Sequence, residues 1–209
     1  MSGSLFVRGI FLLSQYMETI NKSPNENIFV LLQTLNSALE VTPDDLMEKL
    51  VATLDGANRI FVTGVGRSGL VARLFANRLM QCGYKVFIVG ELVTPGVKEG
   101  DLLLVISGSG GTSTLLPLVD KAKSLGAKVA VVSLKTDSPM AKVADLVVAI
   151  GSKDPSVFTK ASGMPMGTIF GGTIFEFSAL IFLEATILYM FREKGLTEEG
   201  MRALHANME

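Results

Sequence analysis

The chain has 209 residues, of which 48% are hydrophobic and 19% are charged, so it can bury a large core and is not of the disordered class. Nineteen basic against 20 acidic side chains give a formal net charge of −1, which provides no basic footprint for nucleic acid. One cysteine, Cys82, and one histidine, His205, exclude an internal disulfide and any His-cluster or Cys–His zinc site, and a reducing compartment fits best.

The N-terminal region contains an apolar stretch, Leu5–Leu13, that an arginine and a glycine interrupt. It has no basic leader and no small-residue cleavage site, so it is not interpreted as a signal peptide. Residues 1–25 are expected to form an extension. Helices are predicted over Asn27–Glu40 and over 42–54, the second opened by a threonine cap, a proline and two acidic residues.

Between residues 58 and 150, short β-rich runs alternate with helical patterns. The runs are nearly continuous in Val, Ile and Leu, as in strands that are covered on both faces. Helical spacing is found over Gly69–Gln81 and Leu115–Leu125, and the Ser-Pro pair at 138–139 predicts another helix start. Strands separated by helices predict a parallel, doubly wound sheet. The predicted strands are Arg59–Thr63, Lys85–Val89, Leu102–Ile106, Val129–Ser133 and Leu146–Ile150.

The stretch Ile169–Phe191 is apolar and long enough to span a bilayer. It contains Glu176 and Glu184, however, and each carboxylate at mid-membrane would cost roughly 2.5–3.5 kcal/mol. A buried helix of a soluble α/β protein explains the stretch better, and its two carboxylates then need partners or a role. A short helix starting at Thr197 is predicted to carry His205.

Two loops at the carboxyl ends of predicted strands, where open parallel sheets bind ligands, are rich in glycine. The first, Gly64–Gly69, matches G-x-G-x-x-G, and Glu91 follows about 20 residues onward, as the ribose-binding acid of a nicotinamide cofactor site would. A dehydrogenase therefore stays an alternative. Arg67 and Ser68 weaken it, because pyrophosphate recognition needs only backbone amides and close approach.

The second loop, Ser107–Thr114, sets several hydroxyls on a glycine frame before a predicted helix. Free N–H groups, the helix dipole and hydroxyl donors favour a phosphate, although a turn with incidental Ser and Gly is the simpler alternative. The loop lacks the Gly-Lys-Ser/Thr of a nucleotide P-loop, which favours a monophosphate ester. The candidate phosphate-binding residues of both loops are Gly66, Arg67, Ser68, Ser107, Gly108, Ser109, Gly110, Gly111 and Thr112.

These motifs resemble a known family. Gly-Val-Gly-Arg-Ser-Gly-Leu-Val-Ala from residue 64 and Ile-Ser-Gly-Ser-Gly from residue 106 are similar to the sugar isomerase (SIS) domain of phosphosugar isomerases and regulators. The first of these motifs with the arginine that follows it, Val-Gly-Glu at 89–91, Gly-Thr-Ile-Phe-Glu ending at Glu176 and the C-terminal Met-Arg-Ala-Leu-His-Ala-Asn-Met-Glu resemble the 6-phospho-3-hexuloisomerases within it. The likeness covers roughly residues 28–209, and His-Ala-Asn is its most specific part.

The resemblance implies a three-layer α/β/α sandwich around a five-stranded parallel, doubly wound sheet of flavodoxin-like order, formed as one SIS domain by residues 26–209. It also implies interconversion of 3-hexulose 6-phosphate and fructose 6-phosphate in the ribulose monophosphate pathway. The protein is then expected to be a cytoplasmic homotetramer without cofactor or metal, with sites near subunit interfaces and no membrane or nucleic-acid partner.

Four side chains are candidates for the chemistry. Moving a carbonyl along a sugar requires a base that works through an enediol, and Glu176 is the candidate, an ion pair with Arg or Lys being its alternative role. His205 is the candidate acid, in its own or a neighbouring subunit. Arg67 is expected to bind substrate oxygens or the enediolate, or to be a surface arginine. Glu184 is expected to be structural.

The sequence departs from the family pattern at Gly111, where a charged side chain is usual, and in the doubled Gly-Thr-Ile-Phe of 167–170 and 172–175. Only the second copy is followed by Glu, so the alignment is set on it. Two rival functions remain. A non-catalytic SIS-type sensor is disfavoured because no DNA-binding helix-turn-helix is visible, and an arabinose-5-phosphate isomerase because that family usually carries an appended regulatory pair.

Overall fold

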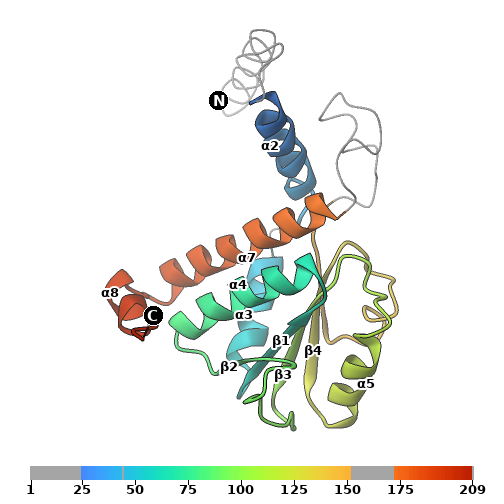
Figure 1. The fold of residues 1–209 in the computed structure, drawn as a ribbon, viewed down its shortest axis with the longest axis vertical. Helices are drawn as coiled ribbons and strands as arrows, with labels where there is room; N and C mark the ends of the chain where they lie inside the picture. The colour runs from blue at the N-terminus through green and yellow to red at the C-terminus, as the bar shows by residue number, and fades with distance from the viewer. Residues whose placement is uncertain (1–24, 44, 152–171, 209) are drawn as a thin grey trace.

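A computed structural model describes residues 25–43, 45–151 and 172–208, and its centre is a five-stranded sheet in the order β2-β1-β3-β4-β5 (Figure 1). All four strand pairings are parallel, and β3, which pairs with β1 and β4, is buried along its whole length. This confirms the predicted parallel, doubly wound sheet and its flavodoxin-like order. The strands are β1 (Ile60–Gly64), β2 (Val86–Ile88), β3 (Leu102–Ile106), β4 (Lys128–Ser133) and β5 (Leu146–Ala149).

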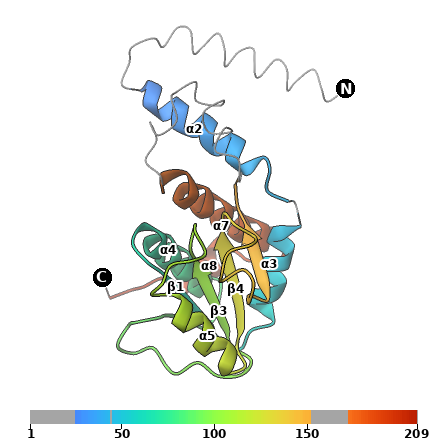
Figure 2. The ribbon, with the colours of Figure 1, turned by 90° about the vertical axis from the view of Figure 1, so that its right-hand side faces the viewer.

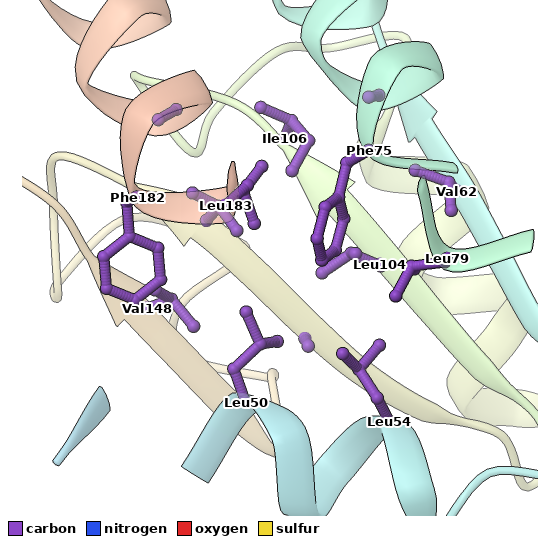
Figure 3. Packing of buried hydrophobic residues seen from close by; sticks show 14 of the residues in the cluster. Leu50, Leu54, Val62, Phe75, Leu79, Leu104, Ile106, Val148, Phe182 and Leu183 are labelled. Carbon is purple, nitrogen blue, oxygen red and sulfur yellow. The ribbon is translucent and has the colours of Figure 1, made fainter. Parts of the chain in front are cut away.

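Three helices cover one face of the sheet: α3 (Leu46–Asp55), α4 (Arg67–Gln81) and α7 (Thr173–Glu193). The other face is covered by α5 (Leu116–Ser124) and by Met140 from the following loop. The result is the predicted three-layer sandwich, with one large apolar core between the sheet and the three helices. Figure 3 shows this core, in which Leu50, Leu54, Phe75, Leu79, Phe182 and Leu183 meet the strand residues Val62, Leu104, Ile106 and Val148.

Helix α7 is the predicted apolar helix, and it is the one described helix long and apolar enough to cross a membrane. Half of its most apolar window is buried, and it packs against α2, α3 and α4. Both of its carboxylates that needed partners have them, Glu176 with Arg67 and Glu184 with Arg78. These contacts confirm α7 as a core helix.

Helix α2 (Glu26–Leu39) extends away from the sheet and rests on the first turn of α7, where Leu35 and Ala38 pack against Ile174 (Figures 1 and 2). The predicted extension over residues 1–24, the loop predicted at 151–167 and the first Gly-Thr-Ile-Phe copy lie outside the described residues, except Gly151.

Two predicted helix starts need correction. The capping bond at Ser138 exists, with its Oγ accepting from the N–H of Ala141 at 3.2 Å, but only one turn follows because β5 begins at Leu146. Helix α3 begins at Leu46 rather than at 42, and its N-cap makes no side-chain hydrogen bond.

Helix α8 (Glu198–Ala203) begins as predicted. The hydroxyl of Thr197 caps it by accepting from the N–H of Gly200 at 3.1 Å. The helix ends before His205, so the prediction that it carries His205 is wrong.

Candidate functional site

A cavity of about 410 Å³ lies at the carboxyl edge of the sheet, where the ends of β1, β3 and β4 meet the first turn of α7. This is the edge at which open parallel sheets bind ligands, and the volume suits a small molecule. The residues that line the cavity are Val65, Ser68, Ile106, Ser107, Gly108, Ser109, Thr112, Leu115, Leu134, Lys135, Gly172, Phe175 and Glu176.

Four hydroxyls of the two glycine-rich loops face this cavity, those of Ser68, Ser107, Ser109 and Thr112. Ser107 is buried, and its Oγ lies 3.3 Å from Oγ1 of Thr112, which fixes the width of the second loop. Helix α5 begins directly beyond the loop, so its positive dipole end points toward the same space. The arrangement is the anion cradle that the sequence predicts.

The loop glycines have different tasks. A Cβ at Gly108 would come within 2.8 Å of the Phe175 ring, so only glycine lets the loop pass beneath α7. Gly110 has a φ of 58° and packs against Ser138, and its carbonyl accepts from the N–H of Met140 at 3.0 Å. Gly108 therefore lines the cavity, whereas Gly110 shapes the loop from outside the lining, as do Gly111 and, in the first loop, Gly66.

Glu176 lies in the first turn of α7 and faces the cavity, with 12% of its side chain exposed. Its Oε2 forms an ion pair with Nε of Arg67, the first residue of α4. The guanidinium is 58% exposed and sits over the Phe177 ring at 5.8 Å from the ring centre. Arg67 is not among the lining residues, so the structure gives it a contact with the candidate base rather than the predicted direct contact with substrate.

His205 does not reach this site within one chain. It follows α8, which lies at the opposite end of α7 from Glu176 (Figure 1), and the intervening helix alone spans about 25 Å. Its Nδ1 lies 3.1 Å from the carbonyl oxygen of Ala206. The predicted catalytic pairing of Glu176 and His205 is therefore not formed within a single chain.

Sequence reasoning missed Lys135, which lines the cavity just beyond the end of β4. The signal was present, because a lysine two residues after a buried parallel strand falls at the ligand-binding edge. Glu91, by contrast, pairs with Arg73 of α4 at 2.6 Å and does not line the cavity. The acid that a nicotinamide ribose would need is thus committed elsewhere. In the part of the chain that the structure describes, no three potential metal ligands gather.

Comparisons with known proteins agree with this site. The SIS domain family matches residues 53–168. The 3-hexulose-6-phosphate isomerase of Methylomonas aminofaciens is 53% identical over 180 residues, which cover 86% of this chain and 97% of that protein. The enzyme of the same name from Bacillus subtilis is 38% identical, covering 88% and 98%.

Solved structures show the same similarity. A hypothetical protein from Methanococcus jannaschii, whose structure led to an inferred function of 3-hexulose-6-phosphate isomerase, matches with a TM-score of 0.72 and 32% identity, covering 88% of this chain and 99% of that one. An Escherichia coli CFT073 protein, solved in complex with a sugar phosphate, matches with a TM-score of 0.71, covering 99% and 100%. At 20% identity, the latter shows a shared fold alone.

Proposed function

The chain belongs to the SIS domain family and within it to the 3-hexulose-6-phosphate isomerases, and from this premise we propose how its site interconverts 3-hexulose 6-phosphate and fructose 6-phosphate. The observation that carries the proposal is the position of Glu176, a carboxylate that faces a cavity lined by four hydroxyls of the phosphate-type loops. One end of the cavity suits the phosphate, and the other holds a base.

Glu176 serves both halves of the reaction. Starting from the 3-ketose, its carboxylate removes the proton from carbon 2, and the electrons of that C–H bond form the double bond of a 2,3-enediol as the carbonyl oxygen gains a proton. The carboxylic acid then delivers its proton to carbon 3, and the ketone forms at carbon 2 as the hydroxyl there loses its proton. A single positioned carboxylate that performs both transfers typically contributes about 10²- to 10⁴-fold in rate.

Arg67 positions this base. Its ion pair with Glu176 joins the first turns of α4 and α7 and holds the carboxylate at the cavity wall. A fixed guanidinium at this place also favours the negative charge that develops on an enediolate. The ion-pair role and the base role that the sequence analysis sets against each other are therefore compatible.

Incubating the protein with fructose 6-phosphate in heavy water tests the function. We expect deuterium to enter carbon 3 and a 3-hexulose 6-phosphate to form without added nicotinamide cofactor, as followed by NMR and mass spectrometry. Binding without exchange would indicate a non-catalytic sensor, and turnover of arabinose 5-phosphate alone would indicate the aldose–ketose isomerase. Either outcome would contradict the proposal.

The proposed assembly is a homotetramer in the cytoplasm, built from the SIS domain of residues 26–209. Exposed apolar side chains on α4 and α7, beside the cavity, support a subunit contact there: Leu70, Leu74, Phe177 and Ile181. In this proposal the C-terminal segment of a neighbouring subunit brings His205 to the site.

A subunit-mixing experiment tests this arrangement. Glu176→Gln and His205→Asn subunits are each expected to be nearly inactive. Mixed tetramers would regain activity at sites where an intact Glu176 meets an intact His205 of a neighbour. If mixing restores nothing although the subunits exchange, the histidine does not act across the interface.

A further inference from the structure

The cavity poses a charge problem for a phosphorylated ligand. A phosphate monoester carries about −1.5 to −2 at neutral pH, and Glu176 already places a carboxylate on the same wall. The four lining hydroxyls are neutral, and Arg67 is engaged with Glu176. Among the described lining residues, Lys135 is the one positive side chain.

The backbone fixes Lys135 against the phosphate-type loop. Oγ of Ser133, the last residue of β4, donates to the carbonyl oxygen of Gly108 at 3.1 Å and accepts from the N–H of Lys135 at 3.1 Å. The N–H of Leu134 donates to the same Gly108 carbonyl at 3.2 Å. The segment after β4 is therefore bonded to the second residue of the loop, and Lys135 starts from the rim of the hydroxyl cradle.

The ammonium group of Lys135 is available for a ligand. Within the residues that the structure describes, no carboxylate lies within 4.0 Å of it, whereas Lys123 pairs with Asp145 at 2.8 Å and Lys194 pairs with Asp55. Its side chain is exposed at the cavity rim, and a flexible lysine is a compact point charge that can follow a phosphate into the cradle.

We propose that Lys135 binds the phosphate group of the substrate and makes the site selective for phosphorylated over unphosphorylated sugars. The inference rests on the proposed function for the identity of the sugar, whereas the phosphate contact itself can be tested without turnover. Its role is in binding: the ammonium balances the dianion while Ser107, Ser109 and Thr112 supply directed hydrogen bonds.

Calorimetric titration with inorganic phosphate at low ionic strength tests the contact. Replacing Lys135 by methionine is expected to weaken phosphate binding about 10-fold, the scale of one lost bond to a charged group. Lys135→Arg should bind as the wild type does, and the difference between wild type and Lys135→Met should shrink with added salt. Lys128→Met, at the other end of β4, is the matched control and should change nothing. Ser107→Ala reports separately on the cradle.

The steady-state constants complete the test. For fructose 6-phosphate, Lys135→Met should raise KM by a similar factor and leave kcat nearly unchanged. Unchanged phosphate binding in Lys135→Met would overturn the proposal, as would a fall in kcat with phosphate affinity intact, because the lysine would then act at the reacting carbons. If the wild type binds phosphate in a Lys135-dependent way but never isomerises fructose 6-phosphate, the proposed function fails and the lysine assignment stands.

Discussion

Replacing Glu176 by glutamine is expected to lower turnover by about 10²- to 10⁴-fold, because the amide keeps the size of the side chain but cannot accept the proton. Substrate should still bind, since the hydroxyls of Ser107, Ser109 and Thr112 are untouched. Steady-state kinetics should show the loss in kcat, and deuterium exchange from solvent into fructose 6-phosphate should disappear in parallel because one proton-transfer step produces both signals.

Glu184→Gln is the matched control on the same helix. Glu184 pairs with Arg78 at 3.4 Å, is 40% exposed and does not line the cavity, so its replacement should leave exchange intact. If the control variant loses turnover while Glu176→Gln keeps it, the alignment across the doubled Gly-Thr-Ile-Phe segment is wrong. If both variants stay active, the base lies elsewhere, and His205 is the next side chain to replace.

The sheet and its ligand-binding edge could be predicted because they depend on local patterns. Near-continuous Val, Ile and Leu runs mark strands buried on both faces, and the rule that ligands bind beyond carboxyl strand ends then places the Ser107 loop at the site. The single turn after Ser138 was mispredicted because a correct cap signal does not reveal how soon the next strand begins.

The parts of the site that sequence reasoning missed depend on distances between segments far apart in the chain. Arg67 meets Glu176 across 109 positions, and nothing in either segment signals the partner. The location of Lys135 beside Gly108 follows from the pairing of β4 with β3. The separation of His205 from Glu176 follows from the length of α7, which places α8 at its far end. Each requires the packed fold.

The second large effect is expected at the amino edge of the sheet, where Asp101 is fully buried. Its carboxylate accepts from Nε of Arg59 at 3.0 Å and from the N–H of Lys98 at 2.8 Å. Burial by itself would raise the pKa of Asp101, but the hydrogen bonds from Arg59 and Lys98 and their charges outweigh it and hold the pKa below its usual range. The ionised carboxylate therefore stabilises the fold.

Asp101→Asn should lower the free energy of unfolding at pH 7 by about 2–4 kcal/mol, because it leaves the largely buried Arg59 without its counter-charge. Since the folded-state pKa of Asp101 is depressed, this contribution is present above the unfolded-state value of about 3.9 and is lost as pH falls through the lower folded-state value. Wild type and variant should thus converge in acid.

Urea unfolding of both proteins at neutral pH and near pH 3 measures this convergence. Glu198→Gln, which removes the exposed pair with Arg202, should cost at most about 0.5 kcal/mol at either pH. Phosphate binding should be unaffected in Asp101→Asn, because Asp101 precedes β3 and the cavity lies beyond the opposite end of that strand. An equal stability difference at both pH values would show that the carboxylate charge is not what stabilises this edge.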